Sequence, residues 1–211
     1  CTVIIDGKAV KACVQQTKNL DGKNIITAEG LSDREKEVFS YAFSEAGAVQ
    51  CGFCIPGMVM CAKALIDKNP DPAKDDVKAA IRNNICRCTG YKKIEDAILI
   101  AADIFRNGKE VPNPVYTGLL GENMHRVDAE GKTLGTAKYA DDYYMENMLL
   151  GSALRSKYPR ARVLSIDTSE AEKTDGVVCI MTAEDIPGTQ KVGHLKRDWD
   201  VLIPVGGITH Y

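Results

Sequence analysis

The sequence lacks an excess of charge of either sign. Its 27 lysine and arginine residues are balanced by 29 aspartate and glutamate residues, which leaves a net charge of −2 at pH 7. A balanced total provides no electrostatic footprint for nucleic acid. The sequence also lacks an apolar run that approaches the ~20 residues of a membrane-spanning helix. We therefore expect neither a nucleic acid nor a membrane as a partner.

Common nucleotide-binding and histidine-based metal patterns are missing too. No G-x-G-x-x-G occurs, so a Rossmann fingerprint has no support. The Gly-Lys-Thr triplet at 131–133 resembles part of a phosphate loop, but Arg126 stands where the first glycine must be. The three histidines have no HxH or HxxxH spacing, and we interpret them as surface or loop residues: His125, His194 and His210.

Cysteine, by contrast, is abundant. The 211 residues include eight cysteines, and no hydrophobic signal segment accompanies them. Without a secretory signal, many thiols indicate metal or redox chemistry rather than disulfides. We therefore expect a cytoplasmic protein with a metal centre. Because the first residue is Cys1 and not Met, we also expect the sequence to be an internal piece of a longer protein.

The first block, residues 1–31, predicts short β-strands. Apolar runs at 2–5 and 8–10 meet across Asp6-Gly7, which is a strong signal for a two-residue hairpin. Residues 24–27 are another strand candidate. The block is too small to form a domain by itself.

The second block, residues 32–108, has the helical period and predicts a compact four-helix bundle. Ser32 and Glu35 form a capping box at its start. The expected helices run from there to Gly47, from Pro56 to Lys68, from a cap and first turn at Asp71-Pro72 to Ile81, and along the apolar positions from Ile94 to a stop at Gly108.

The remaining residues divide into a linker and a mixed region. Residues 109–130 contain two prolines and show no sustained periodicity, so we interpret them as a linker. Residues 131–211 have a mixed α/β texture, with a short helix capped by Thr168 or Ser169 and a turn like a capping box at 182–185. The strand candidates are 149–154, 162–166 and 177–181.

The strongest chemical pattern is Cys51-Gly-Phe-Cys54 followed by Cys86-Arg-Cys88. Each pair is expected at the start of a helix, where free N–H groups and the helix dipole favour thiolates. If the two helices pack side by side, the four thiolates converge. Such a site can hold zinc or a [2Fe–2S] cluster. A zinc-stabilised, non-catalytic interaction module therefore remains an alternative to an iron–sulfur protein.

The other four cysteines carry weaker signals. Cys1 and Cys13 flank the predicted hairpin, which by itself does not identify them as ligands. Cys61 falls on the apolar face of a predicted helix and Cys179 in an apolar strand, so we expect both to be core residues and not ligands.

The segments Gln50-Cys-Gly-Phe-Cys-Ile-Pro-Gly57 and Cys86-Arg-Cys-Thr-Gly-Tyr91 resemble the signature of the molybdenum hydroxylases, the family of xanthine dehydrogenases and aldehyde oxidoreductases. Residues 1–13 resemble the end of the family's plant-ferredoxin-like domain, and residues 131–188 resemble its α/β hammerhead domain. The resemblance implies an α+β multidomain fold. Its parts would be a ferredoxin-like remnant at 1–31, a four-helix [2Fe–2S]-binding bundle at 32–108, a linker at 109–130 and an incomplete hammerhead domain at 131–211.

The resemblance also implies roles for individual residues. Plant-type clusters have the spacing C-x₄-C-x₂-C…C, in which Cys1 matches the third position and Cys13 the fourth. These two would form part of a second [2Fe–2S] site whose other ligands lie upstream. Gln50 and Cys88 match positions near the molybdopterin cofactor. The ligands of the complete [2Fe–2S] cluster would be Cys51, Cys54, Cys86 and Cys88.

The family's reaction is oxidative hydroxylation of a carbon next to nitrogen, or of an aldehyde. The molybdopterin cofactor would be bound mainly by regions beyond Tyr211, which makes the remainder of the polypeptide a partner. Because the predicted linker leaves no room for a flavin domain between the bundle and the hammerhead, electrons would leave to a separate flavin subunit, a ferredoxin or a flavodoxin. A homodimer is expected for the full-length protein. Residues 198–204 resemble selenium-dependent xanthine dehydrogenases, which favours a purine substrate over an aldehyde.

Overall fold

The computed structural model describes residues 1–209, which fall into two compact units. The first unit comprises Cys1–Tyr144 and the second begins at Met145. His210 lies outside the described residues. Within residues 1–209, none of the helices combines the length and the apolar character needed to cross a membrane.

A three-stranded antiparallel sheet begins the first unit. Strands β1 (Thr2–Ile5) and β2 (Lys8–Lys11) form the predicted hairpin, and β3 (Ile25–Ile26) pairs with the other edge of β1. Asp6 and Gly7 both have positive φ angles, 46° and 77°, as a tight primed turn requires. The hairpin prediction is confirmed, and the turn places both ends of the hairpin side by side.

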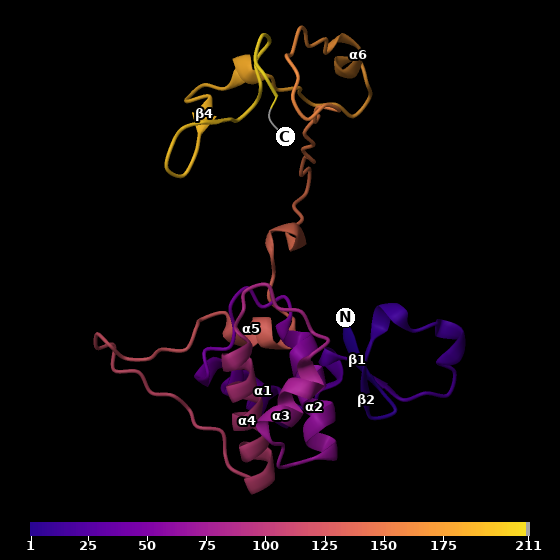
Figure 1. Ribbon diagram of the computed structural model, residues 1–211, viewed down its shortest axis with the longest axis vertical. Helices are drawn as coiled ribbons and strands as arrows, with labels where there is room; N and C mark the ends of the chain where they lie inside the picture. The colour runs from indigo at the N-terminus through magenta and orange to yellow at the C-terminus, as the bar shows by residue number, and fades with distance from the viewer. Residues whose placement is uncertain (210–211) are drawn as a thin grey trace. The chain divides into compact units, whose positions relative to one another are not determined.

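Five α-helices follow in the first unit (Figure 1). The capping box at Ser32 and Glu35 starts the first of them, as predicted, and Gly108 in the left-handed conformation ends the fourth. The helices are α1 (Asp33–Glu45), α2 (Ile55–Lys68), α3 (Lys74–Ile81), α4 (Tyr91–Asn107) and α5 (Ala129–Leu134).

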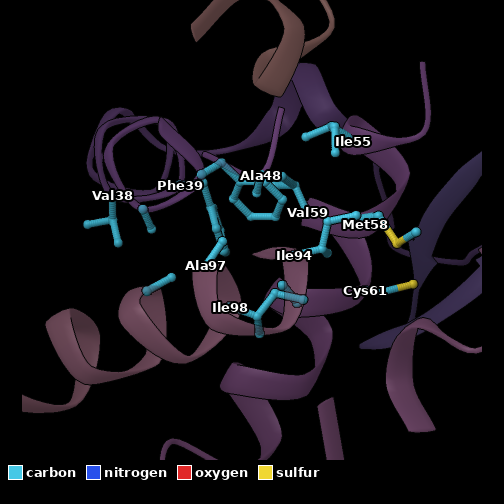
Figure 2. Close-up of a cluster of buried hydrophobic side chains, with 14 of the residues drawn as sticks. Val38, Phe39, Ala48, Ile55, Met58, Val59, Cys61, Ile94, Ala97 and Ile98 are labelled. Carbon is cyan, nitrogen blue, oxygen red and sulfur yellow. The ribbon is translucent and has the colours of Figure 1, made fainter. Parts of the chain in front are cut away.

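The core of the first unit lies between α1, α2 and α4. Figure 2 shows Phe39 of α1, Val59 of α2 and Ile98 of α4 gathered between these helices, and all three are at most 1% exposed. Phe39 also meets Phe105 edge to face, with ring centroids 5.6 Å apart. This core holds the amino-terminal ends of α2 and α4, and therefore both cysteine pairs, in place.

The predicted start of the third helix is wrong by two residues. Asp71 and Pro72 were expected as its cap and first turn, but α3 begins at Lys74. The Asp76 carboxylate accepts a hydrogen bond from the Ala73 N–H at 2.9 Å, which satisfies that donor without a capping side chain. Asp71 instead pairs with Arg106 of α4, a tertiary contact that local sequence does not reveal.

Glu35 provides a test of the helix cap. Burial by itself raises the pKa of Glu35, but hydrogen bonds from Lys63 and Ser32 outweigh burial and hold this pKa below its ordinary value of 4.5. The contribution of the Glu35 carboxylate to the free energy of unfolding is therefore complete above pH 4.5, and it is lost as the pH falls through the lowered pKa. We expect Glu35→Gln to cost about 1 kcal/mol at pH 7. Its free energy of unfolding should fall less between pH 5 and pH 3 than that of the unaltered chain.

Chemical denaturation at several pH values measures both effects. Glu37→Gln is the matched control, because Glu37 is exposed and pairs with Arg34 on the same helix. An equal loss in both variants would contradict a specific role for the cap.

After α4 the chain runs to residue 128 without helix or strand, over most of the segment for which a linker was predicted. His125 was interpreted as a surface or loop residue. It lies between the rings of Tyr41 and Tyr116, with its Nε2 2.8 Å from Glu45 Oε2, and so attaches the linker to α1. The hammerhead was predicted to begin at residue 131, but α5 packs against α1 and α2 and buries Ala129 and Thr133.

The second unit contains short elements. Helix α6 (Ser169–Glu172) follows Thr168 as predicted, and the turn after Thr182 has the predicted capping hydrogen bonds. Strands β4 (Lys191–Val192) and β5 (Trp199–Asp200) pair antiparallel. Short 3₁₀ helices complete the described elements of both units: Ala12–Val14, Thr17–Asn19, Ala28–Gly30, Ala140–Asp142 and Ala183–Asp185.

The strands predicted in the second unit are not formed. Residues 149–154 and 177–181 are irregular, and 162–166 contributes only a bridge between Arg162 and Ile208. Leu150 is 89% exposed and Leu154 fully so. An apolar run becomes a strand only when a partner strand satisfies its backbone and an apolar layer covers its face.

Cys179, expected in the core of such a strand, is correspondingly exposed. The interpretation of Cys179 as a core residue is therefore wrong for this unit.

Candidate metal centre

The first cysteine pair lies in the connection between α1 and α2. Cys54 is the residue that precedes α2, and Cys51 lies three residues earlier in an exposed turn. Gly52 between them has a φ of 88°, a conformation that side-chain-bearing residues rarely adopt. The sequence CGxC thus places glycine where the turn requires it, and both thiols lie at the start of α2 as predicted.

The second pair lies in the turn between α3 and α4. Cys86 and Cys88 are half-buried, and Gly90 precedes the first residue of α4. Thr89 has a positive φ of 58°, so the chain reverses sharply here. This reversal turns several backbone N–H groups toward the Cys86 sulfur.

All four cysteines line one pocket. Core packing brings the start of α2 next to the start of α4, so the two pairs face each other across this pocket. Gln50 also lines it, and its amide lies close to Gly90 of the opposite turn. The lining residues are Ala48, Gln50, Cys51, Gly52, Cys54, Ile55, Cys86, Cys88 and Gly90.

The pKa values of Cys54 and Cys86, which line the same pocket, are shifted in opposite directions. Burial and the neighbouring Cys86 and Cys51 sulfurs raise the pKa of Cys54 to about 12. Burial also acts to raise the pKa of Cys86, but hydrogen bonds from Gly90, Cys54, Cys88 and Thr89 outweigh it and lower the pKa. The turn before α4 is thus built to stabilise negative charge on sulfur.

This donor set fits an iron–sulfur cluster. Four thiols surround the pocket, and N–H groups directed at sulfur are a means by which proteins stabilise such clusters. Within residues 1–209, no group of three or more His, Cys, Asp or Glu side chains is placed to hold a single metal ion.

Tyr91 fixes the second turn. Its hydroxyl accepts a hydrogen bond from the Cys86 N–H at 2.8 Å and donates one to the Asn84 carbonyl at 2.9 Å. The tyrosine of the CRCTGY motif therefore closes the turn on which Cys86 sits.

Asn84 is a structural residue that sequence reasoning missed. Its side-chain amide donates to the Gly57 carbonyl at 2.9 Å and to the Cys61 sulfur at 3.2 Å, and it accepts from the Thr2 hydroxyl at 3.1 Å. It thereby joins the β-sheet, α2 and the turn that carries Cys86. No local pattern marks Asn84, because each partner of its side chain is more than twenty residues away.

The remaining cysteines lie elsewhere. Cys1 and Cys13 are exposed at the same end of the β1–β2 hairpin, where the Ala12 N–H donates to the Cys1 carbonyl at 2.8 Å. Cys61 is 6% exposed and lies on the side of α2 next to the β-strands (Figure 2). Neither Cys61 nor Cys179 lines the cysteine pocket.

Comparison with known proteins connects both parts of the chain to described domains. Residues 27–99 match the family model "[2Fe-2S] binding domain", and residues 134–208 match "Aldehyde oxidase and xanthine dehydrogenase, a/b hammerhead domain". The first match identifies the four-cysteine bundle as a [2Fe–2S]-binding domain, which favours iron–sulfur over zinc.

Individual relatives agree. The aldehyde oxidoreductase of Megalodesulfovibrio gigas is 37% identical over an alignment of 205 positions, which covers 91% of this chain and 22% of that protein. One of the nicotinate dehydrogenase subunits of Pseudomonas putida is 40% identical over 107 residues, 50% of this chain and 68% of its own length. The crystal structure of the aldehyde oxidoreductase from Desulfovibrio desulfuricans superposes with a TM-score of 0.69 at 36% identity, over 91% of this chain and 22% of that one.

The fold and the site therefore define an iron–sulfur electron-transfer protein in which a helical [2Fe–2S] domain precedes a hammerhead domain. The chain belongs to the molybdenum hydroxylase family of aldehyde oxidoreductases and xanthine dehydrogenases, whose members are oxidoreductases. The fold class predicted from the sequence is confirmed. The chain spans 22% of the aldehyde oxidoreductase and about two thirds of the separate small subunits that it matches.

Proposed function

We propose that this chain relays single electrons between a molybdenum centre and an external acceptor, with Cys51, Cys54, Cys86 and Cys88 as the ligands of one [2Fe–2S] cluster. The observation that carries the proposal is that these four thiols, from two helix starts, line one pocket. When bound, the cluster accepts and releases one electron at a time.

The chain's own residues prepare this pocket. The backbone N–H groups before α4 stabilise charge on the Cys86 sulfur, and Tyr91 holds that turn closed. Ile55, 1% exposed, and Ala48, 2% exposed, form an apolar wall of the pocket. Burial and hydrogen bonding to sulfur are the means by which a protein sets a cluster's potential.

Two further assignments belong to this proposal. Cys1 and Cys13 are two of the ligands of a second [2Fe–2S] cluster, supported by their position at one end of the same hairpin. Gln50 and Cys88 lie beside the molybdopterin cofactor, supported by their place in the pocket wall. We also propose the domain boundaries predicted from the sequence, except that α5 is moved to the [2Fe–2S] unit because it packs against α1 and α2.

For the substrate we propose a purine, on the resemblance of residues 198–204 to selenium-dependent xanthine dehydrogenases. The second candidate is an aldehyde, because the relative that matches 91% of this chain is an aldehyde oxidoreductase. Oxidation of xanthine and of an aliphatic aldehyde by the full-length enzyme, compared as kcat/KM, decides between them.

The proposed partners are the molybdenum-binding remainder of the enzyme and a separate flavin subunit, ferredoxin or flavodoxin. Relatives include both long enzymes and separate small iron–sulfur subunits, which supports assembly with further domains or subunits. We propose a homodimer in the cytoplasm, where the reducing environment suits eight free cysteines.

Anaerobic reconstitution of the 211-residue chain with iron and sulfide tests the cluster. We expect a red-brown protein with two iron atoms per chain and an electron paramagnetic resonance (EPR) signal after reduction. A colourless protein that binds zinc in preference to iron would reject the proposal and support the interaction module instead.

A further inference from the structure

The loop that carries Cys51 is held by a segment far away in the sequence. The Tyr139 hydroxyl donates a hydrogen bond to the Cys51 carbonyl at 2.8 Å, although 88 residues separate them. Cys51 is the exposed member of the four cysteines. The hydrogen bond from Tyr139 therefore restrains the part of the site that is most open to solvent.

Lys132 makes a second contact with the same loop. A Cβ atom on Gly52 would lie 2.7 Å from Lys132 Cβ and Cγ and 2.8 Å from its Cδ, so the stem of Lys132 packs directly on the Gly52 backbone. The Lys132 Nζ pairs with Asp128 Oδ2 at 2.8 Å, and only 13% of the lysine side chain is exposed. Lys132 is therefore held in place rather than free in solvent.

The segment from 128 to 139 is itself well ordered by local contacts. Gly135, with a φ of 80°, ends α5 and approaches Pro56 at the start of α2. The Thr136 and Ala137 N–H groups both donate to the Gly131 carbonyl, at 2.8 and 2.9 Å. This reversal directs the following residues back to the cysteine loop.

We propose that Tyr139 and Lys132 are positioning residues for Cys51, and that segment 128–139 is a brace that completes the cluster site from beyond the linker. The inference rests on the proposed cluster ligands. The residues that match the [2Fe–2S]-domain family end at residue 99, so the brace lies outside the matched residues although it belongs to the same compact unit. The Tyr139 O–H dipole partly cancels the negative end of the Cys51 carbonyl dipole close to the cluster, and the Lys132 stem covers the Gly52 backbone.

The direct test is Tyr139→Phe in the reconstituted 211-residue chain. Iron content should stay at two per chain. The midpoint potential should become more negative because the Cys51 carbonyl is no longer compensated, and the EPR g values of the reduced cluster should change. Iron release to a chelator should be about five to ten times faster, which corresponds to one lost hydrogen bond of about 1 kcal/mol.

Matched controls separate positioning from general structure. Tyr143→Phe alters an exposed tyrosine of the same region whose hydroxyl makes no hydrogen bond to the cysteine loop within residues 1–209, and it should leave the potential, g values and release rate unchanged. Lys132→Met keeps an unbranched stem over Gly52 and should behave nearly as the unaltered chain does. Lys132→Ala removes most of that stem and should speed iron release as Tyr139→Phe does.

Failure of the brace and failure of the cluster assignment give different results. If Tyr139→Phe and Lys132→Ala keep two irons with an unchanged potential, unchanged g values and an unchanged release rate, the brace is rejected and the ligand assignment stands. If Cys51→Ala also retains a normal cluster, the ligand assignment itself is wrong. If Tyr139→Phe remains folded by circular dichroism but no longer takes up iron, the brace is supported in a stronger form.

Discussion

Replacing Cys86 with alanine should remove the visible absorption and the bound iron from the reconstituted chain. Cys86 receives more support than any other thiol in the pocket, from the N–H groups of residues 88–90 and from the turn closed by Tyr91. An iron atom that loses one of its thiolates gains an open position, and the cluster then falls apart. The same loss is expected for Cys51→Ala, Cys54→Ala and Cys88→Ala.

Two cysteines serve as matched controls for this experiment. Cys61→Ala should cost about 1 kcal/mol of unfolding free energy, because Cys61 is buried and accepts a hydrogen bond from Asn84, but it should keep the iron. Cys179→Ala, at an exposed position, should change neither stability nor iron content. Normal iron in any of the four ligand variants, or loss of iron in Cys61→Ala, would overturn the assignment.

Asn84→Ala should lower stability strongly although Asn84 is not a cluster ligand. The side chain is 6% exposed and makes hydrogen bonds to the sheet and to α2. Its removal leaves the Gly57 carbonyl without this partner and deprives the Thr2 hydroxyl of its acceptor. Each buried polar group left unpaired costs about 1–3 kcal/mol, so we expect a loss of about 2–4 kcal/mol in urea denaturation.

The neighbouring Asn83 is the natural control, because it has the same side chain but is exposed. Asn83→Ala should change the free energy of unfolding by less than about 0.5 kcal/mol. A comparable loss in both variants would mean that the turn responds to any change of sequence. A neutral Asn84→Ala would show that water replaces the lost bonds, because Lys11 Nζ, 2.9 Å from the Thr2 hydroxyl, is a donor and cannot accept its proton.

Local signals in the sequence predicted local structure well. The Asp6-Gly7 hairpin and the Ser32 cap of α1 form as expected, because each depends on hydrogen bonds or backbone angles within a few residues. The same was not true of Asp71, which was expected to cap α3. A carboxylate can cap its own helix or pair with a distant arginine. Asp71 pairs with Arg106, and this contact exists only because α4 packs beside it.

Apolar patterning alone was insufficient in the second unit. Residues 149–154 and 177–181 have the composition of strands, but a strand also needs a partner and a covering layer. The described residues of this unit supply neither to these runs, so Leu154 and Cys179 are exposed. Whether residues 149–154 and 177–181 form strands therefore depends on the segments that they pack against, and not on their own sequence alone.

The sequence by itself indicated the chemistry of this protein. The spacing of Cys51, Cys54, Cys86 and Cys88 within a helical block is a local feature that pointed to a four-thiolate centre of zinc or [2Fe–2S]. The resemblance of the surrounding motifs then indicated the family and the cluster. Only the tertiary structure decided how the site is held. Asn84 reaches Thr2 across 82 residues and Tyr139 reaches Cys51 across 88, and such contacts arise from the packing of distant segments, which no pattern within a short window encodes.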